Sequence, residues 1–198
     1  MKLIGLTGGI ASGKSTVAKI LQRLGAAIVD ADALSREVVE PGHDGWNEIV
    51  ATFGTQVLQA DQSLDRQKLR TIIFNNPDAR RQLEAIVHPR VRALAEQRIR
   101  EHGEAGYAVV VYEVPLLFEG SLQQWLRPVI LVACDVNIQR QRLQQRDGLD
   151  ATTAQKHIDA QMSLEDKRKI ADYIVENDGN LADLESQVRA VLAKIQAT

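Results

Sequence analysis

The sequence predicts an α/β fold: a parallel five-stranded sheet flanked by helices, with a helical insert and a small helical lid. Three observations predict it. Short apolar runs alternate with longer amphipathic segments. The first run leads into a glycine-rich turn, which opens a helical pattern. The second and third runs are separated by about eighty residues, far more than one crossover helix needs.

Five apolar runs are rich in Val, Ile and Leu and are bounded by Gly, Asp or Pro, as is typical of buried parallel strands. They are Lys2–Thr7, Ala26–Val29, Tyr107–Val114, Val129–Cys134 and Tyr173–Val175. Helical patterns lie between and after them, at about 14–24, 89–102, 138–145 and 181–195. Strand and helix in alternation imply right-handed crossovers between parallel strands.

The long interval contains its own helical patterns, at Ala33–Glu40, Trp46–Phe53, Arg66–Phe74 and Asp78–Ile86. We therefore expect one domain with a sheet core (1–32, 105–145 and 172–198), a helical insert at about 33–104 and a helical lid at about 146–171. In the lid, Thr152 to Gln155 has the pattern of a capping box, and Ser163 is expected to cap the next helix. The pair His88-Pro89 joins two helical patterns, and Pro89 suits a first helical position.

The composition excludes several classes of protein. Lys and Arg total 24 against 26 Asp and Glu, and a net charge of −2 argues against a broadly basic nucleic-acid binder. A hydrophobic content of 44% argues against a disordered acidic chain. The single cysteine, Cys134, can form no intramolecular disulfide, and its apolar neighbours predict a core position. Without a secretory segment or a run long enough to span a membrane, we expect a cytoplasmic protein with no membrane partner.

One motif carries a specific chemical signal. Residues 8–15 fit G-x-x-x-x-G-K-[ST], placed after a strand and at the start of a helix, which predicts a fold of the P-loop NTPase type. Its backbone N–H groups and the helix N-terminus favour phosphate. Lys14 is expected to reach the β- and γ-phosphates, and Ser15 to ligate Mg²⁺. The expected ATP-binding residues of the loop are Gly8, Gly9, Ala11, Ser12, Gly13, Lys14, Ser15 and Thr16.

Acidic residues follow two of the predicted strands. Asp30 and Asp32 end the second one, and ligands of such sheets bind at the carboxyl ends of the strands. Asp32 is our candidate general base, although its position before Ala33 fits a helix cap equally well, and both interpretations stay open. Glu113 ends the third strand at a Walker-B-like position, and its role is left undecided.

Two arginines follow the fourth strand. Arg142 and Arg146 are four residues apart and share one helix face. A solvated face is the ordinary explanation, but a phosphate loop in the same chain favours a lid whose arginines meet phosphates.

The ordered set of motifs resembles the dephospho-CoA kinase family over nearly the whole chain. Ala11 is a departure, because the family often has Gly there. The resemblance rests on the loop, Asp30-Ala31-Asp32, Leu64-Asp65-Arg66, His88-Pro89, Pro115-Leu116-Leu117-Phe118-Glu119, Gln139 with Arg142 and Arg146-Asp147, Gln161, Ala171-Asp172 and Asn177.

This resemblance implies transfer of the γ-phosphoryl of ATP to the ribose 3′-hydroxyl of dephospho-CoA, giving CoA and ADP, the last step of coenzyme A biosynthesis. It implies Asp32 as base, Lys14 and Ser15 at phosphates and Mg²⁺, Arg142 and Arg146 at the transferring group, and Asn177 near adenine. Arg66 and His88 in the insert would bind the acceptor, together with Asp32. The oligomeric state stays open, with a monomer favoured.

Two rival hypotheses remain. A kinase for another small hydroxyl compound or nucleotide would share the core, although adenylate-kinase-like loops carry Gly-Lys-Gly rather than Gly13-Lys14-Ser15. A non-catalytic nucleotide switch is disfavoured, because the Asn-Lys-x-Asp motif of GTPases is absent.

Overall fold

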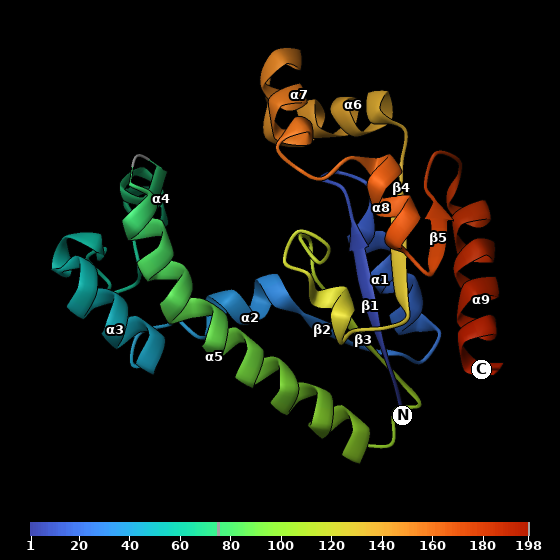
Figure 1. The fold of residues 1–198 in the computed structure, drawn as a ribbon, viewed down its shortest axis with the longest axis horizontal. Coiled ribbons are helices and arrows are strands. Elements are labelled where there is room, and N and C mark those ends of the chain that lie inside the picture. Colours follow the sequence, from blue (N-terminus) through green and yellow to red (C-terminus); the bar gives the residue numbers. More distant parts are fainter. Residues whose placement is uncertain (75, 198) are drawn as a thin grey trace. The chain divides into compact units, whose positions relative to one another are not determined.

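The structure of the protein is a computed structural model that describes residues 1–74 and 76–197. Along the chain, single helices or runs of helices separate most of the strands, and the longest run of helices lies between the second and third strands (Figure 1). In order, the helices and strands are β1 (Lys2–Gly8), α1 (Lys14–Arg23), β2 (Ala27–Asp30), α2 (Ala31–Glu37), α3 (Asp44–Phe53), α4 (Arg66–Phe74), α5 (Pro77–Glu104), β3 (Val109–Glu113), β4 (Val129–Ala133), α6 (Val136–Asp147), α7 (Ala151–Asp159), α8 (Leu164–Ile170), β5 (Tyr173–Glu176) and α9 (Leu181–Ala197).

Within the described residues, five strands form one sheet in the order β2-β3-β1-β4-β5. Strand β1 runs parallel to β3, with Lys2 opposite Val109, and parallel to β4, with Gly5 opposite Val129. Strands β3 and β4 are buried along their whole length, which explains their unbroken apolar sequence. The predicted α/β fold with a parallel five-stranded sheet is therefore confirmed.

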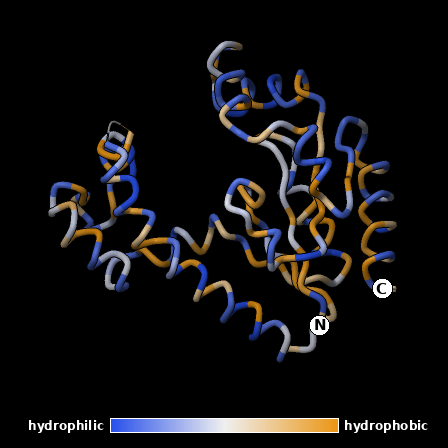
Figure 2. Tube along the Cα trace, viewed as in Figure 1, coloured by the Kyte–Doolittle hydropathy of each residue, from blue (hydrophilic) through white to orange (hydrophobic). Residues whose placement is uncertain are grey.

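The contacts of the chain divide it into two compact units, residues 1–29 with 101–197 and residues 30–100. In the first unit, α1 and α9 cover one face of the sheet, and their side chains share a core with the strands. Figure 2 shows hydrophobic and hydrophilic residues alternating along α9, as expected for a helix with one buried face. On the opposite face, Leu117 and Leu126 pack so closely over Gly5 that a Cβ there would meet Leu117 at 2.9 Å.

The second unit has its own helical core. Side chains of α3, α4 and α5 meet in it, among them Ile49, Phe53, Leu69 and Ile86. An ion pair of 2.5 Å between Arg90 and Glu48 ties α5 to α3. All described residues of this apolar cluster belong to the unit of residues 30–100.

The prediction of a helix start at Pro89 is wrong. Helix α5 runs from Pro77 to Glu104 with Pro89 in its interior. Proline removes one helical hydrogen bond, but its fixed φ is helical, and buried residues on both sides hold the helix together. Arg90 Nη1 donates to the carbonyl of Ile86 at 2.6 Å beside the interruption. The proline at the first helical position is Pro77.

In the lid, one expected helix cap lies elsewhere and another is confirmed. Helix α7 starts at Ala151, and Asp150 rather than Thr152 caps it by accepting a hydrogen bond from the Thr153 N–H. Aspartate caps as well as threonine, so the four-residue pattern alone misplaced the start by two residues. Ser163 caps α8 as predicted.

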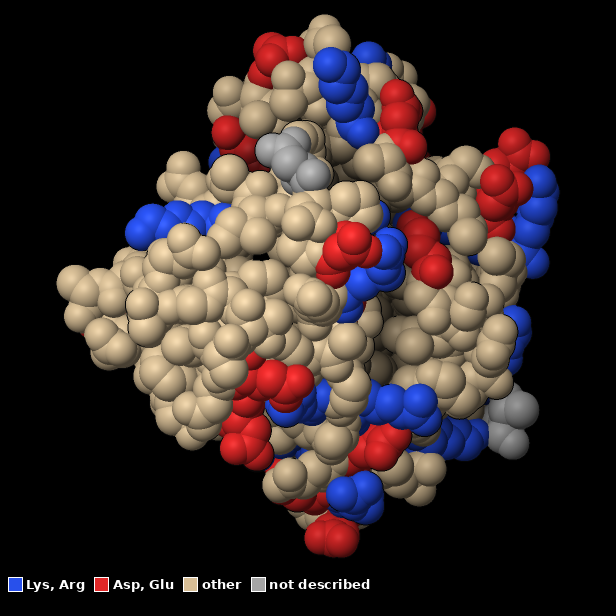
Figure 3. Space-filling view, turned by 60° about the vertical axis from the view of Figure 1, so that its left-hand side comes forward, with Lys and Arg blue, Asp and Glu red and all other residues tan. Residues whose placement is uncertain are grey.

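On the face of the molecule that Figure 3 shows, positively and negatively charged side chains are intermixed among the described residues. In the part of the chain that the structure describes, no helix is long and apolar enough to cross a bilayer.

Candidate functional site

The phosphate loop connects Gly8, the last residue of β1, to Lys14, the first residue of α1. Two of its residues have positive φ angles, 57° at Ala11 and 88° at Gly13. The Ser12 N–H donates to the Gly9 carbonyl at 3.0 Å, which closes a tight turn. The first N–H groups of α1 have no intrahelical acceptors, so this end of the helix favours an anion.

Lys14 is held by an acid from a neighbouring strand. Its Nζ atom lies 2.5 Å from Oε1 of Glu113, and the two side chains are 14% and 8% exposed. Glu113 ends β3, opposite Leu6 of β1, so the sheet register itself brings the acid to the loop. The Walker-B-like position of Glu113 thus corresponds to a direct contact with the loop lysine.

A second set of contacts fixes the end of the loop. Asn177, just after β5, donates from Nδ2 to the Ser12 carbonyl at 2.7 Å. Arg142 of α6 donates from Nη2 to the Asn177 carbonyl at 3.0 Å. A Cβ on Gly13 would collide with Nδ2 of Asn177, so glycine is required there by space as well as by φ.

One buried polar atom of the loop lacks a protein partner. The hydroxyl of Ser12 is buried and makes no hydrogen bond among the described residues. A Cβ on Gly8 would lie 2.5 Å from it. An unpaired buried donor is costly, and an oxygen-rich ligand in the loop would supply the missing acceptor. This observation fits a bound polyphosphate.

The described residues contain no cluster of three or more His, Cys, Asp or Glu side chains that would hold a metal by themselves. Mg²⁺ in phosphotransfer sites is bound through one or two protein groups together with substrate phosphates, so such a cluster is not required. Ser15 lies in the first turn of α1 and is exposed, as a hydroxyl ligand to nucleotide-bound Mg²⁺ must be.

Arg146 differs from Arg142. It is exposed and makes two bonds to the adjacent Asp147, at 2.7 and 2.8 Å. These bonds raise the pKa of Arg146 and lower that of Asp147. Of the two predicted lid arginines, only Arg142 is engaged beside the phosphate loop, where its Nη1 lies 3.8 Å from the position of a Cβ on Gly13.

Cys134 lies at the end of β4 and is 1% exposed, so its predicted core position is confirmed. Burial raises the pKa of its thiol to about 11, although the guanidinium of Arg142 opposes that rise. Nη1 of Arg142 lies 3.4 Å from the sulfur. The thiol is therefore protonated at neutral pH.

The capping interpretation of Asp32 is wrong, because Asp30 is the cap. Oδ1 of Asp30 accepts from the Asp32 N–H at 2.8 Å, and α2 begins between them at Ala31. The chain leaves β2 and enters the helix two residues earlier than the sequence pattern indicated. The carboxylate of Asp32 lies in the first turn of α2 on an exposed residue.

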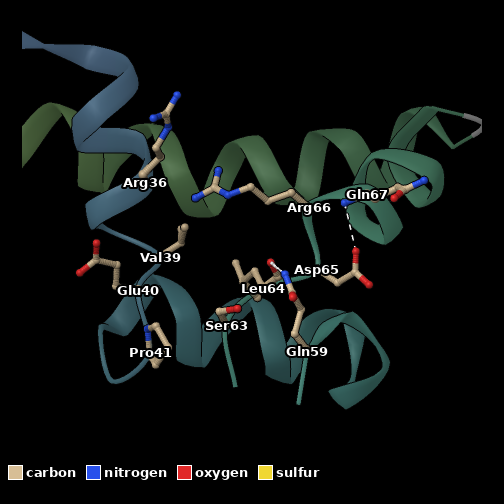
Figure 4. Close-up of a pocket in the computed structure, with 10 residues that line it drawn as sticks. All are labelled: Arg36, Val39, Glu40, Pro41, Gln59, Ser63, Leu64, Asp65, Arg66 and Gln67. Atoms are coloured by element: carbon tan, nitrogen blue, oxygen red, sulfur yellow. Dashed lines mark hydrogen bonds between the residues drawn. The ribbon is translucent and has the colours of Figure 1, made fainter. Parts of the chain in front are cut away.

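The unit of residues 30–100 contains a cavity of about 620 Å³ (Figure 4). Arg66 reaches from α4 toward the side on which α2 carries Arg36. Beside Arg66, Asp65 accepts from the N–H groups of Gln67 and Lys68, and these bonds lower its pKa. Of the two acceptor contacts expected in this unit, Arg66 lines the cavity, whereas His88 is exposed on α5 and is not among the lining residues.

Comparison with known proteins supports one family. The model of the dephospho-CoA kinase family matches residues 2–183. The chain is 47% identical over 191 residues to a dephospho-CoA kinase of Shouchella clausii, covering 96% of this chain and 97% of that protein. It is 44% identical over 192 residues to one from Bacillus thuringiensis, covering 97% and 96%. The chain belongs to the dephospho-CoA kinase family.

The fold agrees with that membership. A dephospho-CoA kinase structure from Campylobacter jejuni superposes with a TM-score of 0.75 at 30% identity, covering 100% of this chain and 98% of that one. The family makes this chain a kinase. The family prediction from the sequence is confirmed.

Sequence reasoning gave two site residues no role. Gln139 and Gln161 both bond to the backbone of Ile10 in the loop, from positions 129 and 151 residues away. No local pattern relates residues so far apart, and both glutamines entered only as part of the family resemblance.

Proposed function

We propose that this kinase transfers the γ-phosphoryl group of ATP to the ribose 3′-hydroxyl of dephospho-CoA, with Lys14, Arg142 and Asp32 in the catalytic roles. The hydroxyl oxygen bonds to the γ-phosphorus as the bond to the bridging β-phosphate oxygen breaks. The products are CoA, ADP and a proton. Family membership over residues 2–183 supports the reaction, and the geometry of the loop supports the roles of Lys14 and Arg142.

Lys14 and the loop N–H groups bind the β- and γ-phosphates in this proposal. The main support for this role is the contact of 2.5 Å between Lys14 and Glu113, because it orients a cation at a helix N-terminus, where phosphate binds. Arg142 is our proposed stabiliser of charge on the transferring group, and Arg146 a second nucleotide contact. Asn177 is the proposed neighbour of the adenine. When bound, Mg²⁺ neutralises charge on the β- and γ-phosphates, and Ser15 is its proposed protein ligand.

Asp32 is the proposed general base. Its neighbour Asp30 supplies the cap of α2, so the carboxylate of Asp32 is not needed for that purpose. A carboxylate at this place accepts the proton of the acceptor hydroxyl as that hydroxyl attacks. The unit at residues 30–100 is proposed to bind dephospho-CoA, with Arg66 and His88 as contacts. The cavity beside Arg66 and Arg36 supports Arg66, since guanidinium groups bind phosphate bidentately.

The deciding experiment measures ADP formation with each of several acceptors at fixed ATP. Dephospho-CoA is expected to give turnover and a product with the mass of CoA. Shikimate, nucleosides and nucleotides serve as competing acceptors, and Lys14→Ala serves as the inactive control. Turnover with one of these acceptors, but none with dephospho-CoA, would support the rival small-molecule kinase instead.

A further inference from the structure

Two glutamine side chains hold the tip of the phosphate loop from different elements. Nε2 of Gln139, on α6, donates to the carbonyl of Ile10 at 2.9 Å. Oε1 of Gln161, in the connection between α7 and α8, accepts from the N–H of Ile10 at 2.8 Å. The backbone partners fix the orientation of both amides, because a carbonyl needs a donor and an N–H needs an acceptor.

The two glutamine side chains lie against the loop beside Gly9, where there is no room for a side chain. A Cβ on Gly9 would lie 2.5 Å from Nε2 of Gln139 and 3.7 Å from Oε1 of Gln161. Gln139 is buried, and its hydrogen bond to the loop is partly buried. Both polar groups of Ile10 are therefore engaged by side chains rather than by other backbone groups.

The two hydrogen bonds to Ile10 matter because the next residue, Ala11, has an unfavourable backbone conformation. Ala11 has φ 57°, in the left-handed region that a residue with a Cβ rarely adopts. Such a conformation costs an alanine roughly 1–2 kcal/mol relative to its ordinary regions. The angle φ of Ala11 depends on the orientation of the Ile10–Ala11 peptide plane. That plane carries the carbonyl that Gln139 binds.

The segment that carries Gln161 is itself anchored. The N–H of the next residue, Met162, donates to Oε1 of Glu119 at 3.0 Å. Nζ of Lys167, a side chain that is 1% exposed, lies 2.9 Å from the same oxygen. Glu119 thus ties α8 to the α7–α8 connection, and Gln161 extends from an anchored segment toward the loop.

We propose that Gln139 and Gln161 are positioning residues that clamp Ile10, and that this clamp keeps the strained Ala11 in the conformation that binds the phosphates of ATP. The proposal rests on the proposed function only in requiring that the loop binds ATP. Without the clamp, Ala11 relaxes to negative φ in a fraction of molecules. The apparent affinity for ATP is then reduced in proportion to the fraction of molecules that remain in the binding conformation.

The directions of the two hydrogen bonds provide a matched test. Gln161→Glu and Gln139→Glu each add one negative charge beside Ile10. A glutamate at 161 still accepts from the Ile10 N–H, whereas a glutamate at 139 can no longer donate to the Ile10 carbonyl. We expect the dissociation constant for ATP, measured calorimetrically without acceptor, to rise about tenfold more for Gln139→Glu than for Gln161→Glu. Equal increases would overturn the clamp.

A double-mutant cycle tests the link to Ala11. Gln139→Ala is expected to raise the dissociation constant for ATP roughly tenfold in the wild-type background. In an Ala11→Gly background the same substitution should cost only about twofold to threefold, because glycine adopts positive φ without strain. An unchanged cost in the glycine background would contradict the proposal. Gln155→Ala is the control, since that amide bonds only to Asp159 on its own helix among the described residues.

Hydrogen exchange of the Ile10 amide gives a readout that needs no nucleotide. Exchange should accelerate in Gln161→Ala and stay slow in Gln161→Glu, whose carboxylate keeps the bond. Fast exchange in the wild-type chain would overturn the clamp. If the wild-type chain instead failed to bind ATP while its Ile10 amide remained protected, the proposed function would fail and the clamp would stand as a structural contact.

Discussion

Nζ of Lys14 lies 2.5 Å from Oε1 of Glu113, and both side chains are largely buried. The pair joins the first residue of α1 to the last residue of β3, so the charge of the loop lysine is balanced from within the sheet. Removing one member of a buried pair leaves the other charge uncompensated, whereas removing both does not. Activity and stability can therefore be separated at this pair.

Lys14→Met is expected to lower kcat by at least 10²–10³-fold, as the loss of a preorganised charge contact does. It should also lower the free energy of unfolding by about 3 kcal/mol, because Glu113 stays buried without its partner. The double variant Lys14→Met/Glu113→Gln should recover much of the stability and none of the activity. Urea denaturation and steady-state kinetics measure the two effects. Near-normal kcat in Lys14→Met would overturn the assignment of the loop.

The control for that experiment is Arg189→Met. Arg189 pairs with Glu185 at 3.2 Å on the surface of α9, and the two side chains are 60% and 32% exposed. An exposed pair of this kind contributes roughly 0–1 kcal/mol. The variant should therefore be nearly neutral for both kcat and unfolding.

The proposed lid should respond to ligands. Only Ala154 is buried in α7, so little apolar contact holds this helix in place. We expect its amides to exchange rapidly in the free chain and to gain protection when ATP and dephospho-CoA are both present. Helix α9, which buries Leu184, Val188 and Ile195, is the internal reference and should change little. Equal protection of α7 with and without ligands would argue against a lid.

The buried thiol of Cys134 leads us to expect a loss of folding stability at alkaline pH. Its thiol has a pKa of about 11 in the folded chain, raised by burial from an ordinary value near 9. Above pH 9 the unfolded chain loses this proton first, so the free energy of unfolding falls as the pH rises toward 11. Between pH 8 and pH 10 the wild type should lose about 1 kcal/mol more than Cys134→Ala. Parallel pH profiles for the two proteins in urea denaturation would contradict this expectation.

The sheet and the phosphate loop could be predicted from the sequence for a physical reason. Strands buried on both faces produce continuous apolar runs, and a phosphate cradle requires glycines at fixed spacing. The course of α5 was not predictable in the same way. Local rules stop a helix before Pro89, yet buried residues on both sides, such as Ile86 and Ile99, hold the helix through it.

The site was predicted where the signal is local and missed where it depends on tertiary contacts. Lys14 and Ser15 belong to one short motif. The partner of Lys14, Glu113, is 99 residues away and was left without a role. Gln139 and Gln161 make bonds whose geometry only the folded loop defines. The cap of α2 fell to Asp30 because the chain turns into the helix directly at the end of β2.

Asp30 and Asp32 can be told apart because only one of them caps α2. Asp32→Asn is expected to lower kcat by about 10²–10⁴-fold, the usual contribution of a placed base. Its free energy of unfolding should change by less than about 0.5 kcal/mol, since its side chain is exposed. Asp30→Asn keeps the cap and should leave kcat within a few-fold, while Asp30→Ala should cost about 1 kcal/mol in urea denaturation. If Asp30→Asn carries the large loss of kcat and Asp32→Asn does not, the base is Asp30.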